Sequence, residues 1–436
     1  MINDLIMFYI LPMIPSVMVV HIKRGHFLRR YLLGYGSAEQ RVMDLSIGDG
    51  ALWSIYSSIT SPYIVPLAIL MLGSSAPIGF ITGLPVIAVP FSQIAAYRIL
   101  RKIDDLKTVT IFTTFLDRIP WLFIAILIFI HTRYFLYMLL GLLIMRSFFS
   151  SLSGTTWMLW IPGLIGEGKR DNYFSTRNMV MKGFGIVGYL IAISVFLLVN
   201  GYKTDYFIIF LVSFIFSALS INIMRNIPGA KVGDVYKTAS KNSTEIEFLL
   251  IIALLSVIGF AYYFSQPYIA LYLLGRPYLD IGSTFYTVVL IASGIVYIGS
   301  QRVGKIMATR TGYASSMAIT LLFLSTLFAV LYFIRTQTLV ILTVVFLSAP
   351  FSIYSLISFN MAVSRSSGEN RVRRTSYYTI ANSLALSAGP IAGNIIYDET
   401  KSIHLVFLIS SAMMVVAILI SIYLIKFGEE RSFGSP

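Results

Sequence analysis

The chain contains a series of twelve apolar segments, each long enough to cross a lipid bilayer. A helix needs about 20 apolar residues to cross ~30 Å of hydrocarbon. At 57% hydrophobic and 12% charged residues, the chain is too apolar for a soluble protein, in which about 25% are charged. Helices satisfy their own backbone hydrogen bonds in lipid, so we predict an all-α membrane protein. The predicted spans are 47–71, 76–97, 108–131, 134–163, 177–199, 205–225, 248–274, 281–303, 313–334, 337–363, 376–397 and 403–425.

These spans form two sets of six, separated by a polar, lysine-containing stretch without apolar periodicity. The predicted division is an N-terminal apolar and basic stretch (1–46), a first six-helix bundle (47–226), a linker (227–247), a second bundle (248–426) and a tail (427–436). Residues 1–20 are apolar but interrupted by Pro12 and Pro15. The run has no basic residues at its start, and Lys23, Arg24, Arg29 and Arg30 follow it. This order argues against a cleaved signal peptide. They could form one extra membrane helix or an interfacial helix.

Two sequence echoes indicate that the halves arose by duplication. Residues Arg170, Tyr173, Phe174 and Asn178 recur 204 positions later as Arg374, Tyr377, Tyr378 and Asn382. Pro62-Tyr63-Ile64 recurs 205 positions later as Pro267-Tyr268-Ile269. Two nearly equal offsets at equivalent places in the span pattern predict two pseudo-symmetric bundles.

The placement of Lys and Arg predicts the orientation of the chain. Loops and ends on one side of the predicted spans hold 25 of these residues, whereas the other side holds five: Arg133, Lys203, Arg276, Arg335 and Lys401. Basic loops stay in the cytoplasm, which places the linker and the C-terminus there, in the cytoplasmic membrane. The net charge of +14 is therefore assigned to topology, and we expect no nucleic-acid partner.

Motifs for other chemistries are missing from the sequence. It has no cysteine, its four histidines lie at the termini or span ends, and it contains no Gly-x4-Gly-Lys-Ser/Thr nucleotide-binding sequence. We therefore expect no enzyme activity, no metal site and no cofactor.

A stretch that begins in the last residues of the fourth span, Trp157…Trp160…Pro162…Arg170…Tyr173-Phe174…Arg177-Asn178, resembles one found in prokaryotic transporters of the major facilitator superfamily. The loop signature of that superfamily between spans two and three is poorly kept at 101–107, and its counterpart at 304–313 has Thr309 where Asp is usual. The resemblance implies alternating access around a midplane site, with spans one, four, seven and ten lining the cavity. It also implies that Arg170, Tyr173, Arg177, Asn178, Arg374, Tyr377 and Asn382 form an inner gate; charge anchoring is the alternative.

Ionisable groups inside the membrane are costly and are therefore candidates for function. The candidates for proton coupling or charge pairing are Asp49, Asp117, Arg118 and Arg146. Arg146 lies 12 residues from the outer end of its span, about 18 Å, and Asp49 lies 22 residues from its own, about 33 Å. Residues that pair must lie at similar depths in the membrane. We therefore predict that Arg146 pairs with Asp117, and that Asp49 pairs with Arg98 or Lys182. Either pair could be purely structural; Asp49 is the preferred protonation site because it is less firmly paired.

Polar and aromatic stripes at helical spacing mark the four expected cavity helices. The candidate lining residues are Trp53, Tyr56, Thr60, Tyr63, Ser150, Trp157, Tyr262, Tyr263, Gln266, Tyr354 and Ser358. Small and hydroxyl residues also mediate helix packing in membranes, which is the alternative reading. Such a lining suits a neutral, amphipathic or singly charged solute. Pro62 and Pro267 are candidate hinges, since a proline frees a backbone carbonyl.

The function expected from these patterns is secondary active transport of a small organic solute, coupled to protons, by a monomer in the lipid bilayer. Efflux of amphipathic compounds is slightly favoured because the predicted cavity carries few charges. Uptake of a sugar-like or carboxylate solute, with Arg146 as the anion partner, is the first alternative. A non-transporting sensor or assembly factor on the same fold is the second.

Overall fold

The computed structural model describes residues 37–73, 77–130, 132–199, 201–231, 245–364 and 370–433. Within these ranges the chain is helical, apart from turns and one isolated β-bridge between Asp105 and Lys231. The apolar segment at 1–20 and residues 232–244 of the predicted linker lie outside the described ranges.

The first six spans contain two breaks at prolines. Their elements are α4 (Ala38–Ser58), η2 (Ser61–Tyr63), α5 (Ile64–Leu72), α6 (Ile78–Gly83), η3 (Leu84–Ile87), α7 (Ala88–Leu100), α8 (Leu106–Leu127), α9 (Phe135–Gly163), α10 (Glu167–Leu198) and α11 (Tyr202–Arg225). Pro62 lies in η2 and Pro85 in η3. Proline has no backbone N–H to continue the α-helical pattern, so both spans pass through a 3₁₀ turn there.

The second six spans are continuous helices: α13 (Glu245–Leu274), α14 (Gly282–Thr311), α15 (Tyr313–Phe333), α16 (Gln337–Ser364), α17 (Asn370–Thr400) and α18 (Ile403–Phe433). Pro267 lies inside α13 without breaking it, so the two matched prolines differ in local structure. Because α18 runs to Phe433, most of the predicted tail is helical.

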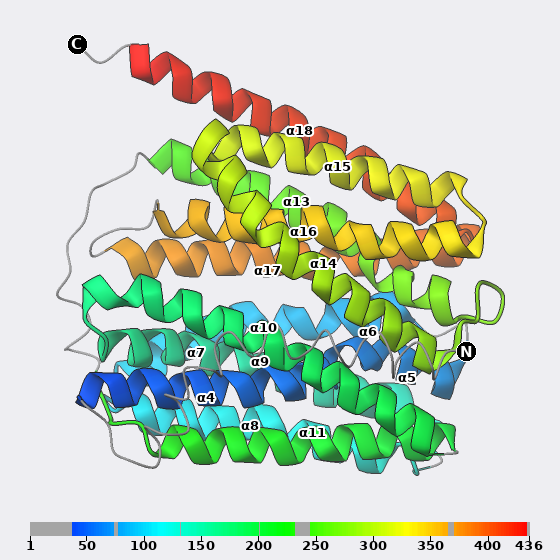
Figure 1. The fold of residues 1–436 in the computed structure, drawn as a ribbon, viewed down its shortest axis with the longest axis horizontal. Helices are drawn as coiled ribbons and strands as arrows, with labels where there is room; N and C mark the ends of the chain where they lie inside the picture. The colour runs from blue at the N-terminus through cyan, green and yellow to red at the C-terminus, as the bar shows by residue number, and fades with distance from the viewer. Residues whose placement is uncertain are drawn as a thin grey trace.

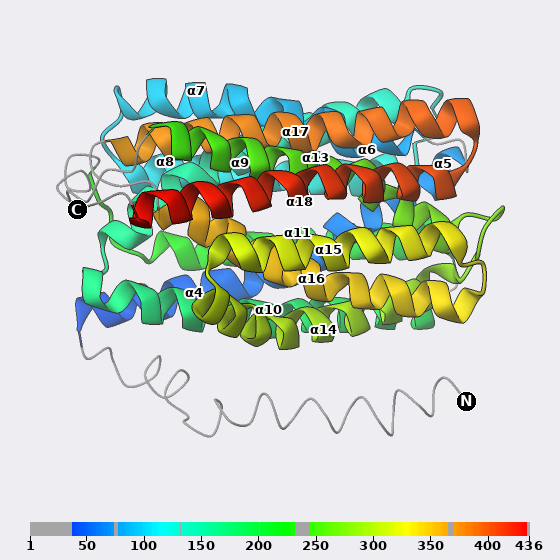
Figure 2. The same cartoon turned by 90° about the horizontal axis from the view of Figure 1, so that it is seen from above.

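Eleven helical stretches in the described part are long and apolar enough to cross a membrane. The exception among the twelve predicted spans is α17, which is richer in polar residues. It runs alongside the others (Figures 1 and 2) and packs against α13 and α6. The predicted all-α fold with two sets of six spans is confirmed.

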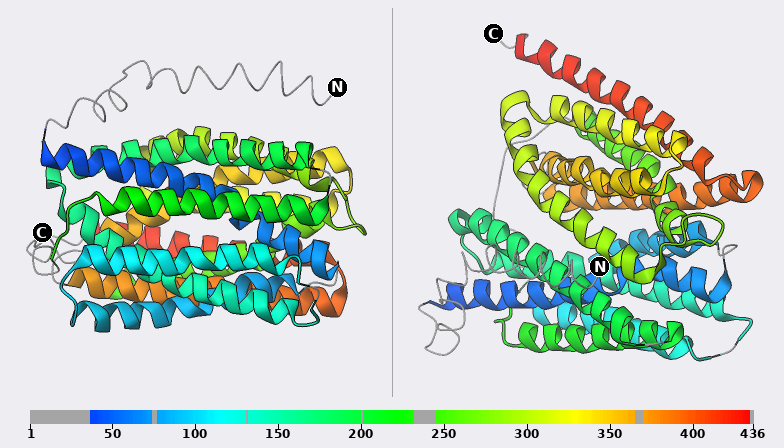
Figure 3. Two further views of the ribbon diagram at one scale, coloured as in Figure 1. Left: turned by 90° about the horizontal axis from the view of Figure 1, so that it is seen from below. Right: turned by 45° about the vertical axis from the view of Figure 1, so that its right-hand side comes forward.

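The helices form two bundles whose long axes diverge (Figures 1 and 3). In the first, α4 packs against α10 and α11, and α8 against α9; in the second, α15 packs against α18 and α14 against α16. Between the bundles, α6 meets α17, α10 meets α14 and α5 meets α13.

We call the end where α4, α8 and α10 begin the basic end, and the opposite end the far end. Arg98, Lys107, Lys169, Arg225 and Arg310 lie at or near the basic end. The right-hand view of Figure 3 shows the bundles separating towards this end and meeting at the far end.

The basic end of the first bundle is packed by the stretch that carried the resemblance. Trp160 is fully buried, in a cluster that includes Ile161 and Tyr173. Its indole N–H donates to the carbonyl oxygen of Pro228 at 2.8 Å. Trp160 therefore ties the end of α9 to the chain leaving α11.

Candidate functional site

A cavity of about 620 Å³ lies between the bundles, within the ~300–1,000 Å³ range of small-molecule sites. It is lined by α4, η2, α5 and α10 of the first bundle and by α13, α14 and α16 of the second, with Thr82 of α6 at its edge. Its polar and aromatic lining residues include Trp53, Ser54, Ser57, Ser58, Ser61, Lys182, Tyr189, Tyr262, Gln266, Tyr286, Ser293, Tyr297, Ser348 and Phe351. Both halves therefore contribute to one site.

The wall from the second bundle is aromatic and firmly held. The Tyr262 ring stacks on Phe351 with centroids 4.3 Å apart, which ties α13 to α16. The Tyr297 hydroxyl lies 2.7 Å from Ser355 Oγ, and the Tyr297 carbonyl accepts a hydrogen bond from Ser352 at 2.7 Å. The stack and the Tyr297–Ser355 contact hold the rings in place, and the Ser352 bond ties the backbone of α14 to α16.

The wall from the first bundle carries hydroxyls. Ser54 donates to the carbonyl of Met181 at 2.5 Å, which joins α4 to α10. A Cβ at Gly188 would lie 2.7 Å from the carbonyl oxygen of Ile55. Only glycine allows α10 to approach α4 this closely, as small residues do at membrane helix contacts.

Five of the predicted lining and hinge residues border this cavity: Trp53, Pro62, Tyr262, Gln266 and Pro267. The other predicted lining residues lie outside it: Tyr56, Thr60, Tyr63, Ser150, Trp157, Tyr263, Tyr354 and Ser358. On span one the reason is helix rotation, because Tyr56 is turned into its own bundle against Arg118 and Thr60 bonds the carbonyl of Tyr56. Span four contributes no residue to the lining, whereas spans five and eight do.

Four of the lining residues that were not predicted share a spacing in the sequence that could have identified them. Ser54, Ser57, Ser58 and Ser61 follow the i, i+3, i+4, i+7 spacing of a single helix face. This hydroxyl face lies beside the predicted stripe of Trp53, Tyr56, Thr60 and Tyr63 on the same span. Tyr189, Tyr286 and Tyr297 had no such signal, because they lie on spans five and eight, which were not expected to line the cavity.

A charged cluster lies inside the first bundle, away from the cavity lining. Asp117 Oδ2 is 2.6 Å from Arg118 Nη1, and Asp117 Oδ1 is 3.7 Å from Arg146 Nε. The depth-based pairing of Asp117 with Arg146 is therefore present, with Arg118 as a closer second cation. Arg118 also bonds the Tyr56 hydroxyl, and the Arg146 guanidinium lies 5.0 Å from the Trp121 ring centroid.

Asp49 is buried near the basic end, with partners other than the predicted ones. Its Oδ1 accepts a hydrogen bond from Ser220 at 2.6 Å, and its Oδ2 is 4.0 Å from Arg177 Nη2. The prediction that Asp49 pairs with Arg98 or Lys182 was wrong. The depth of a residue along a span does not determine which neighbouring helix faces its side chain. Gly50 makes the approach possible, since the Arg177 Nε lies 3.0 Å from where its Cβ would be.

In the first copy of the repeated stretch, the polar side chains hold the first bundle together. Arg170 donates to the carbonyls of Pro162 and Ile165 at 3.0 and 2.9 Å, satisfying the end of α9. The Tyr173 hydroxyl lies 2.7 Å from Ser46 Oγ, and the Arg177 guanidinium lies 4.3 Å from the Trp157 ring centroid.

The second copy is placed differently. Tyr377 is exposed, as is Asn178 of the first copy, and Asn382 lies against Gly259. The side chain of Arg374 lies outside the described part of the structure. The gate role of these residues stays a prediction.

The two bundles are joined by hydrogen bonds towards the far end. The Tyr63 hydroxyl lies 2.8 Å from Thr287 Oγ1, and the Tyr286 hydroxyl donates to the Pro62 carbonyl at 3.3 Å. The Tyr206 hydroxyl lies 3.1 Å from Ser283 Oγ. These contacts close the cavity on the far-end side.

The contact between α6 and α17 is closer still. The Gly79 N–H donates to Asn394 Oδ1 at 3.0 Å. A Cβ at Gly79 would lie 2.0 Å from the carbonyl oxygen of Pro390, and one at Gly83 would lie 2.6 Å from that of Ser387. Only glycine permits this backbone approach.

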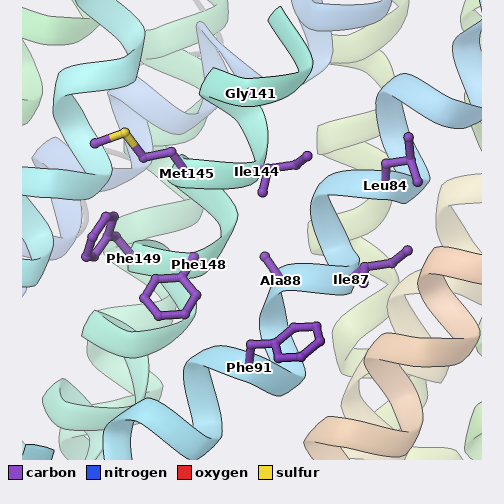
Figure 4. A pocket seen from close by; sticks show the side chains of 9 residues that line it. All are labelled: Leu84, Ile87, Ala88, Phe91, Gly141, Ile144, Met145, Phe148 and Phe149. Atoms are coloured by element: carbon purple, nitrogen blue, oxygen red, sulfur yellow. The ribbon is translucent and has the colours of Figure 1, made fainter. Parts of the chain in front are cut away.

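A second hollow, of about 510 Å³, lies between α7 with η3 and α9 (Figure 4). It is lined entirely by apolar side chains and Gly141. Phe91 and Ile144 on its rim are exposed on the outside of the bundle. With no polar group to orient a solute, this groove fits lipid-facing surface better than a transport site.

No protein-family model matches the sequence, and no curated protein matches it. Solved structures do match its fold. The xylose transporter XylE from E. coli, in a partially occluded inward-open conformation, is 13% identical over 88% of this chain and 97% of its own, with a TM-score of 0.67. The nucleoside transporter NupG is 14% identical over 89% and 99%, with a TM-score of 0.63. A bacterial homologue of the iron transporter ferroportin, in an inward-facing state, is 14% identical over 88% and 98%, with a TM-score of 0.62.

Proposed function

We propose that this chain, whose fold is that of major facilitator superfamily transporters, is a secondary active transporter that moves a small organic solute by alternating access. The observation that carries the proposal is the cavity of about 620 Å³, which is lined by both bundles and closed at the far end. A site shared by two bundles becomes accessible from alternate sides when they rock about it. Both bundles would then contribute to solute binding in every state.

The proposed orientation places the basic end in the cytoplasm and the chain in the cytoplasmic membrane, as the bias in Lys and Arg suggests. The C-terminus would then be cytoplasmic. In this orientation the far-end contacts form the outer gate, and the bundles are separated on the cytoplasmic side.

Cysteine labelling tests both the orientation and the motion, since the natural chain has no cysteine. In whole cells, an impermeant maleimide should label Thr336→Cys at the far end and leave Thr309→Cys at the basic end unlabelled until the cells are permeabilised. Both threonines are exposed, so they are matched. Thr287→Cys, at a position buried in the far-end contact, should be labelled slowly, whenever the outer gate opens. The reverse pattern for the two exposed positions would contradict the orientation.

Asp49 is the proposed protonation site. It is buried, and its nearest cation is 4.0 Å away, whereas Asp117 lies between two arginines. A carboxylate whose cation is more distant loses less electrostatic stabilisation when it takes up a proton. Asp117, Arg118 and Arg146 are assigned to holding the first bundle together.

Asp49→Asn should reduce accumulation driven by a pH gradient at least tenfold and leave solute exchange intact, because a coupled transporter without its proton site still exchanges solute. The measurement uses proteoliposomes and a solute found by thermal-shift screening of the purified protein. Asp280→Asn, in a far-end loop, is the control for the loss of one carboxylate. Undiminished gradient-driven accumulation by Asp49→Asn would exclude it as the coupling site.

Export of an amphipathic compound is the proposed direction, supported by an aromatic and hydroxyl-bearing lining. Uptake of a sugar-like or carboxylate solute is the alternative. Arg146 would not be its anion partner, because it lies outside the lining and contacts Asp117. A sensor or assembly factor that does not transport would keep the cavity but not the motion, so Thr287→Cys would stay unlabelled.

The repeated stretch is proposed to act at the inner gate. Arg177 contacts both Asp49 and the Trp157 ring. Protonation of Asp49 would therefore weaken the electrostatic interaction that helps to hold the Arg177 side chain at the basic end. Pro62, at the 3₁₀ break of the first span, is proposed as a hinge of the outer gate, together with Pro267.

A further inference from the structure

Among the described residues that line the central cavity, Lys182 is the one that carries a charge. We propose that it binds the acidic group of the solute, which makes the solute an amphipathic organic monoanion such as a monocarboxylate. This inference rests on the proposed transport function and specifies its substrate class.

Lys182 reaches from the first bundle to the second. Its Nζ lies 4.0 Å from the ring centroid of Tyr297, so α10 meets α14 through this contact. The hydroxyl of this ring lies 2.7 Å from Ser355 Oγ, and the backbone carbonyl of Tyr297 accepts a hydrogen bond from Ser352. A ring face attracts an ammonium group less strongly than a carboxylate does, so an anion entering the cavity would take over the ammonium as its partner.

No carboxylate of the described lining competes for Lys182, because the lining residues in this part of the chain include neither Asp nor Glu. Elsewhere in the first bundle, Asp49 is bonded by Ser220 and faces Arg177, and Asp117 is held by Arg118. Across the described residues, no ion pair involving Lys182 is formed. The cavity lining therefore carries one positive charge, which a neutral or cationic solute would leave without a counter-ion.

The rest of the lining fits the body of such an anion. Tyr262 stacked on Phe351 offers a flat apolar surface, and Trp53 comes from the opposite bundle. Ser57 and Ser61 add hydroxyls that can donate to an acidic group. A single cation balances a single negative charge, so a dianion would enter with one charge unmatched.

The test is calorimetric titration of the purified full-length protein with matched probes. Benzoate and hexanoate carry the acid, benzamide and hexanamide are their neutral counterparts, and phthalate is the dianion. We expect at least one of the two acids to bind at least tenfold more tightly than its amide and than phthalate. Lys182→Gln should weaken binding of that acid about tenfold or more, since a hydrogen bond to a charged group is lost, and Lys182→Arg should recover most of it.

Lys305→Gln, on the exposed part of α14 outside the lining, removes the same charge and should leave the affinity unchanged. Amides that bind as tightly as the acids, an unchanged affinity in Lys182→Gln, or no binding of either acid would overturn the anion site. If the acids bind through Lys182 while Thr287→Cys is never labelled from outside, the anion site stands and the transport proposal fails.

Discussion

Gly79→Ala is expected to move the protein towards the state in which the far end is open. The added methyl would lie 2.0 Å from the Pro390 carbonyl oxygen and 2.6 Å from Asn394 Cβ, so α6 and α17 could not meet as they do here. Forcing an extra methyl into a packed contact costs ~1–3 kcal/mol, which corresponds to a shift of roughly 5–150-fold in a two-state equilibrium.

The measurement for this variant is the rate at which an impermeant maleimide labels Thr287→Cys from outside. That rate should rise by at least fivefold in Gly79→Ala, and transport should slow because outer closure becomes the difficult step. Gly154→Ala is the matched control, since its added Cβ would meet nothing within 4 Å. Unchanged labelling and full transport in Gly79→Ala would show that this contact does not form the outer gate.

Asp117→Asn is expected to give the largest loss of stability among single changes in the charged cluster. The carboxylate is almost fully buried and faces the guanidinium groups of Arg118 and Arg146. Without it, two cations remain inside the first bundle with no counter-ion. Removing one partner of a buried ion pair costs ~3–5 kcal/mol, most of it from the charge left behind.

Thermal unfolding of the purified protein in detergent measures the effect on Asp117. Asp117→Asn should lower the midpoint strongly. The double variant Asp117→Asn with Arg146→Gln should lose less than the two single variants added together, because residues in contact couple by ~0.5–3 kcal/mol. Additive losses would mean that the two side chains do not interact. Asp280→Asn, on an exposed far-end loop, controls for the change in net charge.

The fold could be predicted from sequence because membrane spanning is governed by segment length and apolarity. The fourth span was predicted at 134–163 and α9 covers Phe135–Gly163. The largest differences are at the basic end, where α10 begins at Glu167 and α4 at Ala38. The additional helical turns are polar, so hydropathy alone could not predict the residues at which these two helices begin.

The cavity was predicted only in part, because sequence gives depth along a helix better than rotation about it. Depth alone paired Asp117 with Arg146, a contact that is present. Rotation decides whether Tyr56 faces the cavity or its own bundle. The span also carries a second polar stripe of four serines between positions 54 and 61, and either stripe could have faced the cavity. Lys182 was predicted only as a possible partner of Asp49, because its place in the lining depends on how α10 packs against α14.

The similarity to sugar, nucleoside and metal transporter structures is a similarity of fold at 13–14% identity. None of those solutes is therefore assigned to this chain. The charge of the lining is a property of its own residues, which is why Lys182 and its matched acid and amide probes are the route to the substrate class.

If the two bundles alternate in opening one cavity, Thr287→Cys must become accessible from outside the cell. The position is fully buried in the far-end contact and bonds Tyr63 across the two bundles. Labelling from outside the cell should be slow but measurable, its rate should rise when Gly79→Ala is added, and Thr336→Cys should be labelled rapidly under the same conditions. Complete protection of Thr287→Cys in both backgrounds, alongside full labelling of Thr336→Cys, would contradict alternating access.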